Sequence, residues 1–197
     1  MQASKQIFNG EDFSDQDLQD AHFDHCEFYQ CRFNHADLTD ATFSHCKFIS
    51  AGDDVGCDFS YATLTSASFK HCNLSMALFK GARCYAIEFR ECNLQGGDFS
   101  RASFANYITP KSYFCSAYIT ACNLAYVDLN SALLEECELF DNRWNGANLT
   151  GASMKGADLS GGQFSAEQWG SFELRGANLT RVELEGLDPR IVSLEGV

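Results

Sequence analysis

The sequence has little proline, little positive charge and no long apolar run. Its two prolines, Pro110 and Pro189, form no linker that would divide the 197 residues into domains. No segment approaches the roughly 20 apolar residues of a membrane span, and the amino terminus has no apolar signal-peptide core. Only 14 lysines and arginines oppose 27 acidic residues, which gives a net charge of −13. We therefore expect a cytoplasmic, soluble protein that binds neither membranes nor nucleic acid directly, and whose partner presents a basic surface.

The sequence also lacks the short motifs that mark common catalytic sites. It has no phosphate-binding loop, no dinucleotide-binding glycine pattern, no nucleophile elbow and no H-E-x-x-H zinc motif. None of its ten cysteines forms a C-x-x-C pair. We expect a protein that is not an enzyme and needs no cofactor or metal, with cysteines that are buried free thiols. A disulfide or a metal site is the alternative for the cysteines.

A period of five residues dominates the sequence. In ANLTGASMKGADLSGGQF, residues 147–164, a large apolar residue occupies every fifth position, and an alanine or glycine precedes it by two. This spacing matches neither the 3.6-residue period of a helix nor the two-residue period of a strand. The phase holds over 8–48, 59–104 and 114–194. Eight of the cysteines fall at the small position, namely Cys26, Cys31, Cys46, Cys57, Cys72, Cys92, Cys122 and Cys137.

This pattern resembles the A(D/N)LXX unit of pentapeptide-repeat proteins. The resemblance implies an all-β fold, a right-handed quadrilateral β-helix in which four units close a square coil of about 20 residues. The large and the small residue would both point inward, and successive coils would stack at the strand spacing of about 4.8 Å. We therefore expect a single domain over residues 1–197 with roughly nine coils. Residues 20 apart should lie over one another, as His25 with His45 and Asp17 with Asp37.

Two interruptions of the period predict loops that project from the coil. The phase slips by one residue between Phe48 and Phe59, near 49–57. Between Phe104 and Phe114, near 105–113, the expected apolar residue is Thr109. Breaks in a regular scaffold often carry function, although a tolerated insertion is the alternative. The candidate contact residues are Ser50, Gly52, Asp53, Asp54 and Gly56 in the first loop, and Asn106, Tyr107, Ile108, Thr109, Pro110, Lys111, Ser112 and Tyr113 in the second.

Several stretches with residues outside the basic repeat resemble the Qnr quinolone-resistance proteins. They are SASFKHCNLS (66–75), FCSAYITACNLAY (114–126), CELFDNRW (137–144) and GLDPR (186–190). The resemblance implies binding to the type II topoisomerases DNA gyrase and topoisomerase IV, and protection of both from fluoroquinolones through the two loops. It also implies a homodimer joined through the C-terminal coils, although this sequence lacks the apolar helix that follows the matching LEGV in that family. The interface residues would be Trp169, Leu174, Leu179, Leu184 and Leu194.

Outward acidic residues leave two other functions open. Many directly precede the large residue of a unit, namely Asp12, Asp17, Glu27, Asp37, Asp58, Glu88, Asp98, Asp128, Glu138 and Asp158. They could serve solubility alone, or they could imitate duplex DNA, which carries one charge per about 1.7 Å. A DNA-mimic inhibitor of gyrase that competes with DNA is therefore one alternative. A structural solenoid with an unrelated partner is the second.

Overall fold

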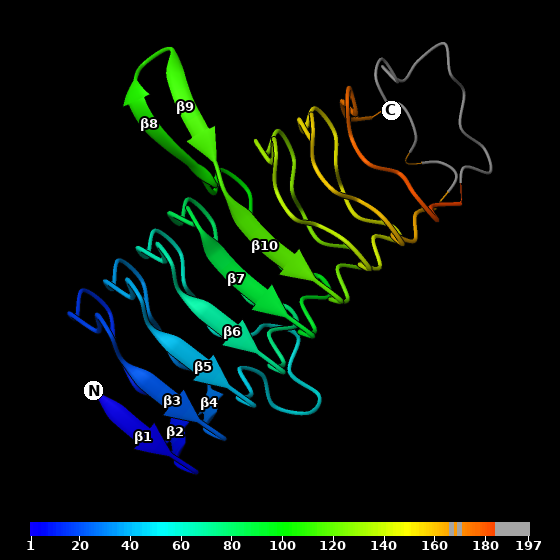
Figure 1. Ribbon diagram of the computed structural model, residues 1–197. Helices are drawn as coiled ribbons and strands as arrows, with labels where there is room; N and C mark the ends of the chain where they lie inside the picture. Colours follow the sequence, from blue (N-terminus) through cyan, green and yellow to red (C-terminus); the bar gives the residue numbers. More distant parts are fainter. Residues whose placement is uncertain (166–167, 169–170, 184–197) are drawn as a thin grey trace.

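The computed structural model describes residues 1–165, 168 and 171–183. Short strands and single bridges stack along one axis into a solenoid (Figure 1). One side of the solenoid is a parallel sheet with the order β1 (Gln2–Ser4), β3 (His22–Asp24), β5 (Thr42–Ser44), β6 (Ser68–Lys70), β7 (Ile87–Arg90) and β10 (Ala117–Thr120).

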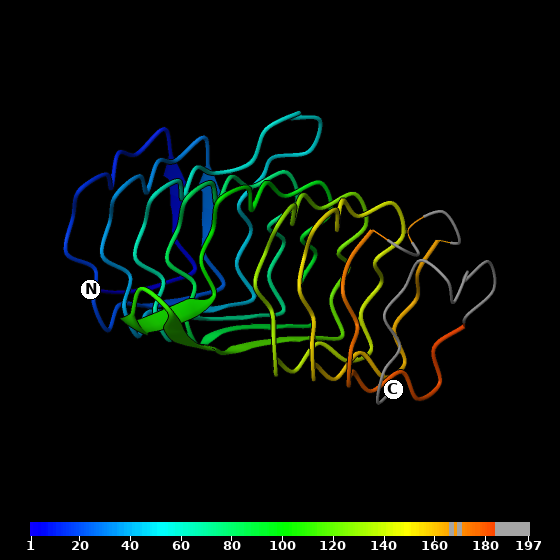
Figure 2. The ribbon, with the colours of Figure 1, turned by 90° about the horizontal axis from the view of Figure 1, so that it is seen from above.

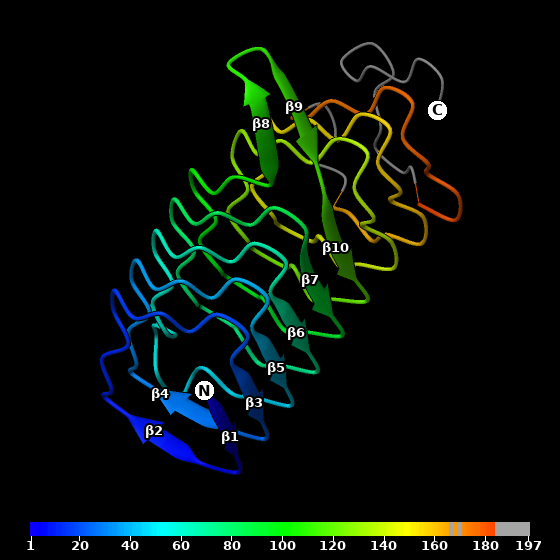
Figure 3. The ribbon, with the colours of Figure 1, turned by 60° about the vertical axis from the view of Figure 1, so that its left-hand side comes forward.

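Two further strand pairs complete the described sheet structure. The parallel pair β2 (Ile7–Asn9) and β4 (Glu27–Tyr29) lies on the side next to β1 and β3 (Figure 3). The pair β8 (Ala105–Thr109) and β9 (Ser112–Cys115) is antiparallel and extends away from the coil. No helix in the described part of the chain is long and apolar enough to cross a membrane.

The large residue of each unit fills the interior of the solenoid. Phe23, Phe43, Phe69 and Phe89 follow one another along the axis, with successive ring centroids 4.9, 4.6 and 5.1 Å apart. All four are at most 2% exposed. Full burial of a phenylalanine contributes about 1.5–3 kcal/mol, so this column stabilises each coil on the next. The inward rows predicted from the five-residue period are observed, and the right-handed quadrilateral β-helix that the resemblance implied is confirmed.

Left-handed backbone conformations turn the corners between units. The residue two positions after the large residue has a positive φ, as in Asp15 (58°) and His25 (52°). The N–H of His25 then donates to the carbonyl oxygen of Ser44 in the next coil at 2.8 Å. A residue other than glycine pays about 1–2 kcal/mol in this conformation, and Asn and Asp tolerate it best. This explains why polar residues and glycine recur at the corners.

The spacing between paired strands shows where extra residues enter the solenoid. β1 pairs with β3, and β3 with β5, at a spacing of 20 residues. The spacing is 26 where Thr42 pairs with Ser68 and 30 where Ile87 pairs with Ala117, so one coil holds six extra residues and another holds ten. The prediction that Phe114 points into the core is wrong. Phe114 lies on β9, and its side chain is 60% exposed. Ten extra residues are two whole units, so the phase continues although the residues have left the coil.

The buried cysteines stack along the axis as the phenylalanines do. The eight at the small position are at most 3% exposed, as expected, and Cys84 at a large position is fully buried. All ten cysteines are free thiols. The N–H of Cys72 lies 3.5 Å from Sγ of Cys92, and the N–H of Cys92 lies 3.4 Å from Sγ of Cys122. The sulfur atoms are therefore weak acceptors for backbone N–H groups in the interior.

Candidate partner-binding surfaces

The first insertion forms a loop over residues 49–56 that is closed at its base by backbone hydrogen bonds. The N–H of Cys57 donates to the carbonyl oxygen of Phe48 at 3.0 Å, and the N–H of Gly56 donates to that of Met76 in the next coil at 3.0 Å. A Cβ on Gly56 would lie 2.7 Å from the carbonyl oxygen of Ser75. Because backbone atoms cannot move aside as a flexible side chain can, this position requires glycine. Gly56 is buried and holds the loop against the coil.

The other predicted contact residues of this loop are more accessible. Gly52, with a φ of 92°, and Asp54 are exposed, whereas Ser50 and Asp53 are half-buried. The N–H of Asp53 donates to the carbonyl oxygen of Ser50 at 3.2 Å, which forms a turn at the start of the loop. The loop therefore presents a carboxylate at Asp54 on a short, turn-stabilised segment.

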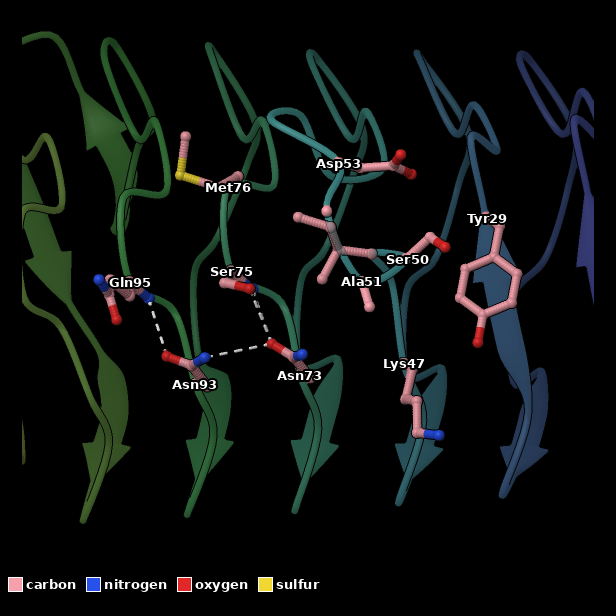
Figure 4. Close-up of a pocket in the computed structure, with 12 residues that line it drawn as sticks. Tyr29, Lys47, Ser50, Ala51, Asp53, Asn73, Ser75, Met76, Asn93 and Gln95 are labelled. Atoms are coloured by element: carbon pink, nitrogen blue, oxygen red, sulfur yellow. Dashed lines mark hydrogen bonds between the residues drawn. The ribbon is translucent and has the colours of Figure 1, made fainter.

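The first loop covers one side of an open groove of about 560 Å³ that polar and apolar side chains line together (Figure 4). Side chains of two later coils form its floor, where Nδ2 of Asn93 donates to Oδ1 of Asn73 at 3.3 Å. The groove offers hydrogen-bond donors and acceptors to a bound group. Its lining residues are Tyr29, Lys47, Ile49, Ser50, Ala51, Gly52, Asp53, Asn73, Ser75, Met76, Asn93 and Gln95.

A single carboxylate organises the end of the groove nearest the amino terminus. Oε1 of Glu27 lies 2.9 Å from Nζ of Lys47, and Oε2 accepts a hydrogen bond from the hydroxyl of Tyr29 at 2.6 Å. The hydrogen bond that Nζ of Lys47 donates to Glu27 and the negative charge of Glu27 raise the pKa of Lys47. The groove therefore keeps one ammonium group. The sequence alone did not identify Lys47, Asn73 or Asn93 as groove residues. Lys47 lies next to Asn73, 26 residues later, and this spacing is known only from the pairing of the coils in the structure.

The second insertion is the hairpin β8–β9, which carries its apolar side chains into solvent. Ala105 pairs with Cys115 and Asn106 with Phe114, and the register is irregular between Tyr107 and Thr109. Tyr107 is 54% and Ile108 is 63% exposed. Pro110 and Lys111 form the turn. Exposed aromatic and apolar groups on a short hairpin are typical of the residues that dominate protein–protein contacts.

The side chain of Tyr113 connects the hairpin to the body of the solenoid by a hydrogen bond. Its ring lies 5.5 Å from that of Tyr107, centroid to centroid, and its hydroxyl donates to Oε2 of Glu135 at 3.3 Å. Burial and the neighbouring Glu135 carboxylate raise the pKa of Tyr113, so it remains a hydrogen-bond donor at neutral pH. Of the predicted contact residues, Tyr113 therefore also positions the hairpin against the body. Glu135 was not identified from the sequence, since nothing in the repeat distinguishes it from other outward acids.

The two insertions leave the solenoid on different sides. The first loop leaves after Phe48, and the hairpin leaves after Phe104. These residues stand in columns separated by two units of a four-unit coil. Figures 1 and 2 show the loop and the hairpin on opposite sides of the axis. They are also two coil steps apart along the axis, because β6 and β7 lie between them in the sheet.

The acidic residues form outward columns that also contain basic and uncharged hydrogen-bond partners. The backbone of Asp17 forms a parallel β-bridge with that of Asp37, and the backbone of Glu138 forms one with that of Asp158, as the 20-residue spacing predicts. Other carboxylates accept hydrogen bonds from the adjacent coil, listed by donor and acceptor as Arg32 to Asp12 at 2.6 Å, Asn34 to Asp58 at 2.8 Å, Asn148 to Asp128 at 3.0 Å and Asn178 to Asp158 at 3.0 Å. These partners reduce the repulsion between like charges at strand spacing. The surface keeps its negative charge without long runs of adjacent acids.

The residues predicted for a dimer interface are only partly described. Leu174 is fully buried in the core of its own chain, and Leu179 is partly buried against that core. Trp169, Leu184 and Leu194 lie outside the described residues. The homodimer through the C-terminal coils stays a prediction.

A stack of five-residue units with a phenylalanine and leucine core is the architecture of pentapeptide-repeat proteins. The Pentapeptide repeats family matches the sequence in eight copies, over residues 4–34, 17–51, 57–96 and 132–166. In the solved structures, full-length QnrB1, described as a plasmid-mediated fluoroquinolone resistance protein, superposes with a TM-score of 0.95 at 42% identity. The match covers 100% of this chain and 92% of QnrB1. The chain thus belongs to the pentapeptide-repeat family and, within it, to the Qnr quinolone-resistance proteins.

Two relatives match over shorter segments. The pentapeptide repeat protein VPA0095 of Vibrio parahaemolyticus serotype O3:K6 is 53% identical over 124 residues, which are 63% of this chain and 57% of that protein. Pentapeptide repeat protein QnrB4 of Escherichia coli is 49% identical over 79 residues, which are 40% of this chain and 37% of that protein. The matches therefore span less than two thirds of the length of these curated relatives.

Proposed function

We propose that this protein binds the type II topoisomerases DNA gyrase and topoisomerase IV and protects them from fluoroquinolones, without catalysing a reaction. The observation that carries the proposal is the likeness to QnrB1 over the whole chain, since that protein is described as a fluoroquinolone resistance protein. The resemblance of the stretch 114–126 to Qnr proteins supports the choice of a topoisomerase as the partner.

Charge and shape support the same proposal. The net charge of −13 favours approach to a basic surface, such as one that holds DNA. Once the rod is bound, the exposed Tyr107 and Ile108 would supply the apolar contacts of the hairpin. Asp54 of the first loop would contact a basic group on the other side. The solenoid would orient the two insertions on the topoisomerase, and the insertions would reach toward the drug-bound cleavage complex.

A supercoiling assay with gyrase and an inhibitory concentration of ciprofloxacin tests the proposal. The protein is titrated beside two deletion variants, one lacking 105–114 and one lacking 51–56. In the first, Ile119 follows Phe104 by five positions, and in the second, Phe59 follows Phe48 by five positions. Each deletion therefore restores an unbroken repeat, and thermal unfolding by circular dichroism checks that the solenoid remains folded.

We expect the intact protein to restore supercoiling and the variant lacking 105–114 to lose this effect. A single substitution tests one side chain of the hairpin. The Tyr107→Ala variant should reach half-maximal recovery of supercoiling only at about tenfold higher concentration, which corresponds to a loss of about 1.4 kcal/mol of binding free energy. Tyr126→Ala is the matched control, because Tyr126 is a 68% exposed tyrosine of the coil body. Full recovery by the variant that lacks the hairpin would contradict a role for the hairpin.

The acidic columns favour DNA mimicry as the second candidate function. A mimic would inhibit gyrase without drug, would do so with both deletion variants, and would lose affinity steeply as salt increases. If neither the intact chain nor the variants change supercoiling with or without drug, both proposals fail, and the solenoid has an unrelated partner.

A further inference from the structure

Three histidines stack on one outer corner of the solenoid, a group that the proposed function does not use. His25 follows β3, His45 follows β5 and His71 follows β6, so each stands at the carboxyl end of a strand in the main sheet (Figure 1). Their ring centroids are 4.6 and 4.8 Å apart, with interplanar angles of 10° and 20°. We refer to His25, His45 and His71 as the histidine column.

The column arises because all three residues occupy the same corner position. Their φ angles are 52°, 54° and 55°, so their Cα–Cβ bonds point in nearly the same direction. Hydrogen bonds from the N–H of His25 to the carbonyl oxygen of Ser44 and from the N–H of His45 to that of Lys70, both at 2.8 Å, fix the coil spacing beneath them. The imidazoles are therefore held side by side by a rigid backbone, while the rings themselves lie in solvent.

A carboxylate lies at each end of the column. Oδ1 of Asp24 is 2.9 Å from Nδ1 of His25, and Oε2 of Glu91 is 3.3 Å from Nδ1 of His71. The side chains of Asp24 and His25 are 53% and 52% exposed. Within the described part of the chain, Asp24, His25 and His45 are the one group of three ligating side chains whose ligand atoms all lie within 4.8 Å of one another.

We propose that His25, His45 and Asp24 bind a divalent transition-metal ion of the class that prefers imidazole, Zn²⁺, Ni²⁺ or Cu²⁺. Metal–nitrogen distances of about 2.0–2.1 Å and metal–oxygen distances of about 2.0–2.2 Å require the ligand atoms to approach one another more closely than 4.8 Å. Rotation of exposed side chains supplies this movement without any change in the backbone. Two imidazoles and one carboxylate leave a coordination position for water. Two nitrogen ligands disfavour Mg²⁺ and Ca²⁺, which prefer oxygen.

His71 and Glu91 distinguish this site from general attraction to the column. The Glu91 carboxylate already pairs with His71, and neither belongs to the group of close ligands. We expect His71→Ala to change the affinity for Zn²⁺ less than His25→Ala does. Asp24→Asn keeps the size of the side chain and removes its charge, so it should weaken binding as well.

Isothermal titration of ZnCl₂ into the full chain, after treatment with EDTA, tests the proposal. The titrations use a Cys115→Ser background, because Cys115 is the one cysteine that is not fully buried and is a possible zinc ligand itself. We expect one equivalent of Zn²⁺ to bind, and His45→Ala to weaken the binding at least about tenfold. His35→Ala is the matched control, because His35 also stacks on an outer corner, over Tyr61 at 5.2 Å, but lies outside the group.

Imidazole NMR signals identify the ligands directly. The chain has five histidines, and substoichiometric Cu²⁺ should broaden the signals of His25 and His45 first and that of His35 last. An unchanged affinity in His45→Ala, an equal loss in His35→Ala, or no zinc uptake below millimolar concentration would each overturn the proposal. The circular dichroism melting curve of each variant shows whether the solenoid is still folded.

Discussion

Oδ1 of Asn142 accepts a hydrogen bond of 2.8 Å from the backbone N–H of Cys122, one coil earlier. In the coils before it, Sγ of a cysteine occupies the equivalent place. The amide of Asn142 also donates to the carbonyl oxygens of Leu139, at 2.9 Å, and Ile119. Asn142 is completely buried. A polar side chain in the core is thus fully partnered and continues the cysteine column.

Asn142→Ala should destabilise the protein by about 2–4 kcal/mol, because it leaves the N–H of Cys122 and two carbonyl oxygens buried without partners. Asn142→Cys restores the acceptor found in the earlier coils and should cost less than the alanine variant. Urea unfolding monitored by circular dichroism measures both values. Equal losses for the two substitutions would show that the cysteine sulfur does not replace the hydrogen-bond acceptor that Asn142 supplies.

Gly81→Ala should destabilise the protein more than Gly151→Ala. Both glycines have a left-handed φ, 67° and 70°, so alanine costs about 1 kcal/mol at either position. A Cβ at Gly81 would also lie 2.6 Å from Cε1 of Tyr61, whereas one at Gly151 would lie 3.3 Å from Oγ of Ser131. We expect an additional cost of about 1 kcal/mol at Gly81. The double variant with Tyr61→Ala should remove it, and additive losses in that thermodynamic cycle would refute the steric explanation.

Glu88→Gln should lower stability at neutral pH and change it little at pH 3. Burial raises the pKa of Glu88, but hydrogen bonds from Ser68 and Lys70 and the charges of Lys70 and Arg90 outweigh this effect, so the pKa lies below its usual value. A lowered folded-state pKa gives stability that is present above the unfolded pKa and lost as pH falls through the folded one.

We expect a loss of about 1 kcal/mol at pH 7, since solvent screens part of the interaction. Thermal unfolding between pH 3 and pH 7 measures this difference. Glu91→Gln is the control, because Glu91 is exposed and contacts His71 only at 3.3 Å. A Glu88→Gln deficit that is as large at pH 3 as at pH 7 would exclude the ionised carboxylate as its cause.

One cysteine should react with iodoacetamide in the folded protein. Cys115 is half-buried on β9, and the other nine cysteines are buried. Burial raises the pKa of Cys137 to about 12, and burial also raises that of Cys115, so even the accessible thiol should react slowly. Mass spectrometry should detect one modified thiol before unfolding and ten in urea. Rapid modification of several cysteines in the native Cys115→Ser variant would show that the coils open.

The sequence predicts the interior of this protein better than its insertions. The five-residue period identifies inward residues such as Phe23 and Cys72 because every unit obeys the same geometric rule. It also predicts the stacking of His25 on His45, since 20 residues return the chain to the same corner. Stacking of His71 on His45 requires the six-residue insertion to be subtracted, and the strand pairing reveals that number.

The limits of the prediction have a physical cause as well. Phe114 keeps the phase of the repeat, because the hairpin insertion equals two units, and periodicity alone cannot reveal that it has left the coil. Asn142 follows the repeat as a small-position residue although it is polar, and its role depends on an N–H in another coil. The groove under the first loop depends on Asn73 and Asn93, which later coils contribute. Contacts of this kind join residues of different coils and depend on how the coils stack, so no short sequence pattern predicts them.

The opposite placement of the two insertions restricts the shape of any partner that contacts both at once. At the strand spacing of about 4.8 Å, two coil steps put them only about 10 Å apart along the axis. A flat protein surface can lie against one side of a square rod and reach one insertion. A partner that contacts both must surround the rod on at least three sides, so it must have a cleft as wide as the solenoid. Closure of such a cleft around the rod would limit the rate of association, and its opening would limit the rate of release.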